Sequence, residues 1–362
     1  MHPYSQLPSR NFWRKFVSDS PWRDLNLNDK PKFSLQATDR IATAGSCFAQ
    51  HISRYMTQVG LAPYIAEPAH TLLQEFGGEV ESHHLFSARY GNIYTVRQLL
   101  ELFRQAFGLM PMIEDFVEHD GRWFDLLRPN VQKSGFSSRA EARADRAFHL
   151  TRVKAMFENA DVLVFTLGLT ESWNNAVHGG YTYPVCPGTV RGNYDSNHHV
   201  FHNFTCSEIV ADLETLISES RPVNPQLRLI LTVSPVQLVA TNTGNNVLIA
   251  SSYSKSVLRA AAGEIEARHG HVAYFPSFEI ISHSASHGQY LSSDLREVTE
   301  RGVRHVMENF LSSFYGIKAG SATLVPKPLD DAPPTVRATM MPPVECDELM
   351  NAPDAAKARS RA

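Results

Sequence analysis

Three short apolar runs constrain the fold of this 362-residue chain more than any other feature. They occupy 161–166, 227–233 and 272–275, and each is continuously apolar rather than alternating. Continuous runs are typical of parallel strands that are buried on both faces. Parallel strands are joined by crossovers of ten or more residues, which are usually helical. The pattern therefore predicts an α/β protein with helices on both faces of a sheet.

Helical periodicity fills the intervals between these runs. A strand candidate at 39–44 precedes a helix at about 48–59, and Gly60 follows as a stop signal. The other helical patterns lie at about 96–107, 138–160, 207–219, 247–268 and 298–314. The stretches 65–92 and 171–205 are irregular, and they are long enough for functional loops.

The periodic pattern is confined to one part of the chain. A prior of roughly 150 residues per domain allows one large domain with extensions, or two domains. The pattern covers about 35–316, which we expect to form one domain. Residues 1–34 are aperiodic and are expected to form an arm on that domain. Residues 317–362 are rich in proline, alanine and charge, which predicts a disordered tail.

Composition excludes several classes of function. With 34 Lys+Arg against 37 Asp+Glu, the net charge of −3 argues against a nucleic-acid partner. The 4 cysteines are too few for a disulfide framework, which favours a reducing, cytoplasmic location. No apolar run approaches the ~18 residues of a membrane span, and the first residues lack the pattern of a signal peptide. No glycine-rich phosphate loop occurs, so we expect no nucleotide or other cofactor.

The pentapeptide Gly-Ser-Cys-Phe-Ala at 45–49 lies where the first predicted strand meets the first helix. Ligands of open α/β sheets bind at the carboxyl ends of the strands, so Ser46 would face that crevice. Unpaired N–H groups at a helix N-terminus would stabilise an oxyanion, which favours Ser46 as a nucleophile. Two alternatives stay open. Ser46 could simply cap the helix, or the thiol of Cys47 could be the nucleophile.

The same pentapeptide is the name-giving motif of the GSCFA family, which this chain resembles. Further family-like stretches follow in order at 87–95, 166–173, 233–236 and 274–279. The resemblance covers roughly 35–316. It implies a flavodoxin-like, three-layer α/β/α sandwich with a mainly parallel sheet, as in SGNH hydrolases. It also implies ester cleavage or acyl transfer on acylated carbohydrate.

The resemblance also implies roles for individual residues. Ser46 matches the nucleophile, and the backbone N–H of Gly91, with Asn92 beside it, matches an oxyanion donor. The N–H of Cys47 is a further candidate donor. In the next block, Gly168 precedes Thr170, which stands where SGNH enzymes have asparagine, and Glu171 would organise the crevice by accepting hydrogen bonds.

The last block departs from the family pattern. Asp294 matches the aspartate of Asp-x-x-His, but Glu297 stands where the base histidine is expected. Either the base comes from elsewhere, or Glu297 serves, or the base is absent. Among the 16 histidines, His287 in the loop before the last helix is the preferred base, and His51 on the first helix is a second candidate.

Two functions follow from these residues. The first is a serine-dependent ester hydrolase or acyltransferase acting on a small-molecule or glycan substrate, such as an O-acylated carbohydrate or a polysaccharide precursor. The alternative is a non-catalytic carbohydrate-binding or assembly protein on a degenerate SGNH fold. In either case Trp173, Tyr181 and Tyr183 are candidates for stacking on sugar rings. The oligomeric state stays open.

Two other groups of residues, a histidine-rich segment and three basic residues, are candidates for binding roles. The histidines at 198, 199 and 202 have no second ligand cluster to complete a metal site, so no metal is expected. Arg89, Lys255 and Arg259 could lie near the crevice, but for Lys255 and Arg259 a solvated helix face is the preferred interpretation.

Overall fold

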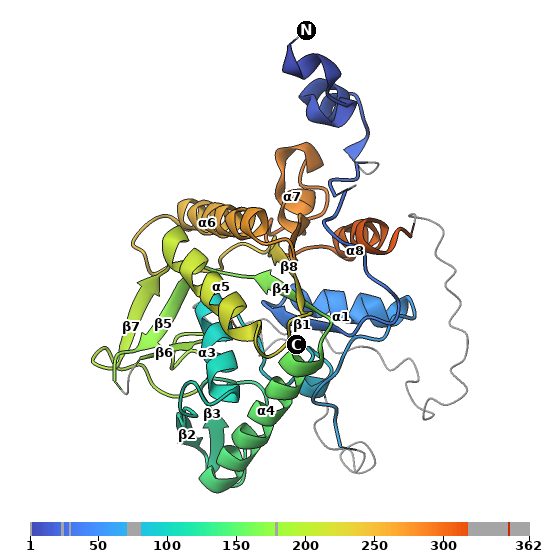
Figure 1. The fold of residues 1–362 in the computed structure, drawn as a ribbon. Helices are drawn as coiled ribbons and strands as arrows, with labels where there is room; N and C mark the ends of the chain where they lie inside the picture. The colour runs from blue at the N-terminus through green and yellow to red at the C-terminus, as the bar shows by residue number, and fades with distance from the viewer. Residues whose placement is uncertain are drawn as a thin grey trace.

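A parallel sheet of four strands forms the centre of the molecule in a computed structural model that describes residues 2–22, 25–28, 30–70, 81–177, 180–317 and 347. The strands are β1 (Ile41–Gly45), β4 (Val162–Leu167), β8 (Arg228–Val233) and β9 (Val272–Phe275), in the order β1-β4-β8-β9 (Figure 1). Gly45 lies opposite Thr166, and Thr166 lies opposite Thr232. The carboxyl ends of the strands therefore meet at one edge of the sheet.

Helices cover both faces of this sheet (Figure 1). One face packs on α3 (Val96–Ala106), α4 (Arg139–Asn159), α5 (Cys206–Ser220) and α6 (Val247–Arg268). The other packs on α1 (Ala49–Gln58), α7 (Ser277–Ser282) and α8 (Glu300–Tyr315). The side chains of β4 alternate between the two cores, Leu163 and Phe165 facing the first and Val162 and Val164 the second. The predicted three-layer α/β/α sandwich is confirmed.

Part of the chain that we expected to be irregular is a second sheet. Within 171–205, β5 (Glu171–Asn175) pairs antiparallel with β6 (Tyr181–Tyr183) and with β7 (His199–Asn203), in the order β6-β5-β7. A hairpin of β2 (Phe116–His119) and β3 (Arg122–Asp125) was also not predicted. These strands have three to five residues and mix polar with apolar side chains, so they carry no apolar run.

Shorter helical turns complete the described chain. They are η1 (Pro3–Gln6), η2 (Ser9–Asn11), the π-helical turn η3 (Arg14–Ser18), η5 (Glu81–His83) and η6 (Ser284–Ser286). The first three form the N-terminal segment, which projects from the sandwich at the top of Figure 1. The rings of Trp13 and Trp22 both pack against His283, after α7.

The free edge of β1 is covered by irregular chain rather than by a strand. Three backbone hydrogen bonds make this contact, from Tyr64 N to Ile41 O at 2.9 Å, from Ser87 N to Thr43 O at 3.5 Å and from Ile93 N to Gly45 O at 2.8 Å. The bonds use alternate residues of β1, as a paired strand would. They hold the segment 87–93 beside the end of β1.

Two sequence expectations concern the surroundings of the sandwich. In the described ranges, no helix is both long and apolar enough to cross a membrane. The predicted tail at 317–362 lies outside the described residues, apart from Ile317 and Asp347. Asp347 is buried, with 4% of its surface exposed.

Candidate functional site

Gly45 brings β1 to its end against β4. Its φ angle is +137°, and an added Cβ would lie 2.4 Å from the carbonyl oxygen of Thr166. Only glycine fits there, because other residues avoid this conformation and the space is already filled. The next residue, Ser46, donates its N–H to the same Thr166 oxygen at 3.2 Å. That N–H is therefore engaged by β4.

The hydroxyl of Ser46 has an unusual environment. The residue is 2% exposed, and its Oγ has no hydrogen-bond partner in the described part of the chain. Helix α1 begins after Phe48, which lies in helical conformation without a side-chain cap. Ser46 therefore does not cap α1. An unpaired buried hydroxyl lowers the free energy of unfolding by about 1–3 kcal/mol. A serine kept in such a position is therefore a candidate for a functional role.

Gly168 packs directly against Ser46 from the end of β4. An added Cβ would lie 2.9 Å from Ser46 Cβ and 3.1 Å from the carbonyl oxygen of Tyr94. The N–H groups of Gly168 and Leu169 both donate to that Tyr94 oxygen at 3.0 Å. Gly168 thus provides close packing, and its N–H is already engaged.

A buried lysine lies behind the same turn. Lys255 of α6 is 2% exposed, and its Nζ donates to the carbonyl oxygen of Gly168 at 2.7 Å. The interpretation of Lys255 as part of a solvated helix face is therefore wrong. Arg259, one turn further along α6, pairs with Glu279 at 2.6 Å and is partly exposed.

Two threonines add unpaired hydroxyls near the end of β4. The Oγ1 atoms of Thr166 and Thr170 are buried and have no partner among the described residues. The backbone of Thr170 is fixed, because its N–H donates to Ser254 Oγ at 3.1 Å and its carbonyl accepts from Phe204 N at 2.8 Å. Its side chain is free to donate.

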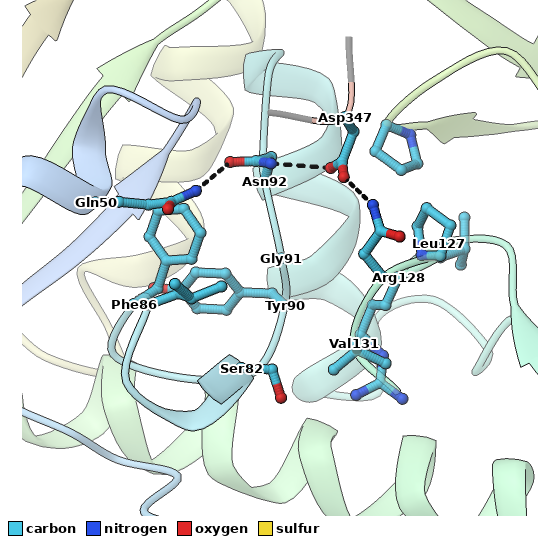
Figure 2. Close-up of a pocket in the computed structure, with 14 residues that line it drawn as sticks. Gln50, Ser82, Phe86, Tyr90, Gly91, Asn92, Leu127, Arg128, Val131 and Asp347 are labelled. Atoms are coloured by element: carbon cyan, nitrogen blue, oxygen red, sulfur yellow. Dashed lines mark hydrogen bonds between the residues drawn. The ribbon is translucent and has the colours of Figure 1, made fainter. Parts of the chain in front are cut away.

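Gly91 and Asn92 lie at the covered edge of β1. Gly91 has a φ angle of +69°, and its N–H has no protein acceptor in the described ranges. Asn92 is 5% exposed and accepts from Gln50 Nε2 at 3.1 Å, while its own Nδ2 donates to Asp347 Oδ2 at 2.9 Å (Figure 2). Gln50 comes from the first turn of α1, four residues after Ser46.

These side chains line a small pocket that Asp347 fills. Its walls include Gln50, Tyr90, Gly91, Asn92, Arg128, Asn130 and Asp347 (Figure 2). The space left is about 20 Å³, enough for one water molecule. The backbone N–H of Asp347 donates to the hydroxyl of Tyr94 at 3.1 Å, so the pocket adjoins the residue that packs on Gly168.

A buried network of charges supports this pocket from below. Arg128, a pocket wall that is 2% exposed, pairs with Asp125 and with Asp145 at 2.8 Å each, and Arg89 pairs with Asp145 at 2.7 Å. Burial opposes the charged form of Asp145, but the two guanidinium groups lower its pKa to about 2. The network stays charged at neutral pH and holds the backbone just before Gly91.

A histidine–carboxylate pair extends this network. His149 Nδ1 lies 2.7 Å from Glu67 Oε2, which also accepts the backbone N–H of Arg89 at 2.7 Å. Burial lowers the pKa of His149 against the opposing effect of Glu67, and Nδ1 donates to that carboxylate. The sequence drew attention to Arg89 alone among these residues, because the others come from segments far apart in the chain.

The residues of the expected base lie on the chain between α7 and α8. His287 is exposed, with a φ angle of +52°. The exposed Asp294 accepts the N–H groups of Arg296 and Glu297 at 3.0 Å through Oδ1. No hydrogen bond or ion pair in the described chain joins His287, Asp294 or the exposed Glu297 to Ser46.

The second histidine candidate and the rival nucleophile lie on the same turn as Ser46. The ring of His51 lies 5.5 Å from that of Phe48, and burial lowers the pKa of His51 to about 4. His51 does not hydrogen-bond to Ser46. Cys47 is buried, with 5% of its surface exposed.

Glu171 belongs to a second hollow, next to the β5 sheet. It accepts from Thr241 Oγ1 at 2.6 Å and from Asn242 N at 3.1 Å, and so anchors the loop after β8. This hollow has a volume of about 260 Å³ and includes Trp173. Tyr181 and Tyr183 are buried, and both hydroxyls bind Asp115, so these rings are not free to stack on a sugar.

The histidine-rich segment is held by local contacts. His199 Nδ1 accepts from the N–H of Asp195 at 3.0 Å, and His202 pairs with Glu208 at 2.9 Å. No group of three or more potential metal ligands occurs within the described ranges.

The fold and the Ser46 turn together define a class: a parallel α/β sandwich with a buried serine directly after its first strand. The sequence profile of the GSCFA family matches residues 40–310, which run from β1 into α8. The chain belongs to the GSCFA family. No curated protein sequence matches it.

Proposed function

We propose that this protein is a Ser46-dependent ester hydrolase or acyltransferase. The observation that carries the proposal is the Ser46 hydroxyl itself, which is buried at the carboxyl end of β1. It has no hydrogen-bond partner among the described residues and does not cap α1. Gly45 and Gly168 confine it by close contacts with β4. A costly, fixed and unpaired hydroxyl is what a positioned nucleophile requires.

In this mechanism Ser46 Oγ attacks the acyl carbonyl and forms an acyl-enzyme, with the alcohol as leaving group. Water then releases the acid, or a second hydroxyl accepts the acyl group. The N–H of Gly91 and the hydroxyl of Thr170 are the proposed oxyanion donors, since neither has a partner in the described chain. Lys255 Nζ holds the carbonyl oxygen of Gly168 from behind this turn.

The proton of Ser46 also needs an acceptor. His287, oriented by Asp294, remains the proposed base, although it makes no hydrogen bond to Ser46 in the described chain. Catalytic hydrogen bonds are often long in unliganded enzymes and tighten with substrate.

The proposed substrate is an O-acylated carbohydrate or polysaccharide precursor. The hollow that Trp173 lines supports a carbohydrate substrate, because the half-buried indole of Trp173 leaves part of its ring accessible for stacking on a sugar.

Labelling with a fluorophosphonate probe tests the nucleophile. We expect labelling of the wild-type chain, complete loss in Ser46→Ala and retention in Cys47→Ala. The same samples should hydrolyse a simple acetyl ester only when Ser46 is present. Labelling that survives Ser46→Ala but not Cys47→Ala would assign the nucleophile to Cys47. His287→Ala tests the base and should slow labelling without abolishing binding of the probe.

A second candidate function is non-catalytic carbohydrate binding. It is favoured by one observation, that no histidine or carboxylate of the described chain bonds to Ser46. This function is expected to leave Ser46 unlabelled and the acetyl ester intact. Binding of an O-acetylated oligosaccharide should then weaken in Trp173→Ala and not in Ser46→Ala.

A further inference from the structure

The side chain of Asp347 is held as a bound carboxylate would be. One oxygen, Oδ2, accepts from Asn92 Nδ2 at 2.9 Å, and the other, Oδ1, accepts from Asn130 Nδ2 (Figure 2). Its backbone N–H donates to the hydroxyl of Tyr94 at 3.1 Å. Asp347 lies thirty residues beyond Ile317 in the sequence, so these contacts bring distant parts of the chain together.

Two side chains of the receiving pocket, those of Asn92 and Asn130, donate to this carboxylate. Gln50, fully buried, donates to Asn92 Oδ1, which turns the Asn92 amide so that its Nδ2 faces the pocket. Arg128 contributes a buried cation to the wall. Among the described lining residues, Asp347 is the sole acidic side chain. A buried carboxylate needs such donors, because an unpaired charge would be too costly.

The pocket is also coupled to the Ser46 turn. The carbonyl of Tyr94 accepts from Gly168 N, and its hydroxyl accepts from Asp347 N. Gln50 lies on the first turn of α1, four residues after Ser46. A ligand in this pocket would therefore lie beside Gln50 and Asn92, and Tyr94 links the pocket to Gly168, which packs on Ser46.

We propose that this pocket is a carboxylate-binding subsite beside Ser46, and that Asp347 is its occupant in cis, competing with carboxylate ligands in trans. The ligand class is a carboxylate, carried either by a small acid such as an ester-cleavage product or by an acidic sugar. The inference goes beyond the proposed function, because carboxylate binding does not require Ser46 to react.

Competition between the chain's own aspartate and a peptide tests this occupancy. A labelled peptide covering 343–351, kept reduced, is titrated into each protein and followed by fluorescence anisotropy. A tethered occupant has an effective concentration on the order of millimolar, which the free peptide must overcome. We therefore expect binding to Asp347→Ala at least about ten-fold tighter than to the wild type.

Two controls make the result specific. Glu118→Ala removes an exposed carboxylate from the β2 hairpin and should bind the peptide as the wild type does. The same peptide carrying the Asp347→Ala change should not bind any of the proteins. Equal binding of the unchanged peptide to the wild type and to Asp347→Ala would overturn the proposal.

The source of the carboxylate is distinguished by displacement of the peptide from Asp347→Ala. Displacement by acetate and by glucuronate alike supports a subsite for the carboxylate alone, and stronger displacement by glucuronate assigns it to acidic sugars. Glucose, which lacks the charge, should not displace the peptide. If neither acid displaces the peptide, the pocket is not a carboxylate site.

A pocket variant locates the binding. Asn130→Asp, made in the Asp347→Ala background, replaces a donor by a like charge and should weaken peptide binding at least about ten-fold. Circular dichroism checks that this variant is folded, and a folded variant with unchanged binding contradicts the proposed site. Ser46→Ala combined with Asp347→Ala should still bind the peptide, so failure of the labelling experiment would refute only the proposed function.

Discussion

At Gly168 the backbone passes so close to Ser46 that no side chain fits between them. We expect Gly168→Ala to displace Ser46 or Tyr94, because its Cβ would lie 2.9 Å from Ser46 Cβ. The crowding should cost about 1–3 kcal/mol of unfolding free energy. Fluorophosphonate labelling of Ser46 should fall at least about ten-fold, since small displacements of reacting groups slow reactions strongly. Urea unfolding and labelling rates measure the two effects.

Gly270→Ala is the matched control for this substitution. An added Cβ at Gly270 meets no atom within 4 Å, so labelling should be unchanged and stability should change little. A Gly168→Ala protein that labels as fast as the wild type would show that Ser46 is not confined by this contact.

The positions of individual site residues could be predicted from the sequence where those residues belong to a local motif. The glycine–serine turn places Ser46 at a strand end from sequence alone, because strand, turn and helix follow each other within a few residues. Lys255 was misassigned, since one lysine on a long helix has the pattern of a surface residue. Only the packing of α6 against Gly168 shows that its Nζ is buried.

The start of α3 is the element that positions Asn92 and Tyr94. Its N-cap residue Thr95 accepts from Gln98 N, and Gln98 Oε1 accepts the N–H groups of Tyr94 and Thr95 at 2.9 and 3.1 Å. We expect Thr95→Ala to cost about 1 kcal/mol of stability, the usual value of an N-cap. Labelling of Ser46 and peptide binding should both weaken, because the pocket wall loses its anchor.

Thr205 offers a matched control, because it begins α5 with the same capping box. Thr205→Ala should lose a similar unfolding free energy while labelling and peptide binding stay at wild-type levels. If both variants impair labelling equally, the effect of Thr95 is one of general stability and not of position.

The long helices were predicted within about two residues, and the short strands outside the central sheet were missed. Helix α6 was expected at 247–268 and is found there, with Asn246 as its N-cap residue. Strands β5 and β7 have the sequences ESWNN and HVFHN, which offer neither an apolar run nor a clear alternation. They form a sheet only through their pairing with each other.

At the scale of the whole molecule, one buried carboxyl should make stability depend on pH. Burial raises the pKa of Glu101 from its ordinary value of 4.5 to about 7, against hydrogen bonds from Thr182 that lower it. Between these values the folded chain holds a proton that the unfolded chain has lost. The free energy of unfolding therefore falls as pH rises from about 4.5 to 7, by at most about 3 kcal/mol.

Glu101→Gln removes this titration and keeps a group that can bind Thr182. The variant should gain stability relative to the wild type as pH rises through that window, measured by urea unfolding at pH 4.5, 6 and 8. The exposed Glu118→Gln should follow the wild-type curve. Parallel curves for the wild type and Glu101→Gln would contradict the pKa assigned to Glu101.

Contacts between segments far apart in the chain could not be predicted from the sequence. The sandwich follows from local patterns, but the contacts of Asp347 with Asn92, Asn130 and Tyr94 join segments more than 200 residues apart. Nothing in the residues around 347 signals a buried position. The ion pair of Arg128 with Asp145 could not be predicted from the sequence either, because single charged residues are usually found on the protein surface.

The covered edge of β1 bears on how this protein avoids aggregation. An open strand edge is a template on which a second chain can add a strand, and such addition leads to polymers. Here the carbonyl of Ile41 already accepts from Tyr64, and those of Thr43 and Gly45 accept from the segment 87–93, which carries Gly91 and Asn92. A foreign strand could pair there only by displacing that segment. Resistance to edge-to-edge polymerisation and integrity of the serine site are thus maintained by the same hydrogen bonds.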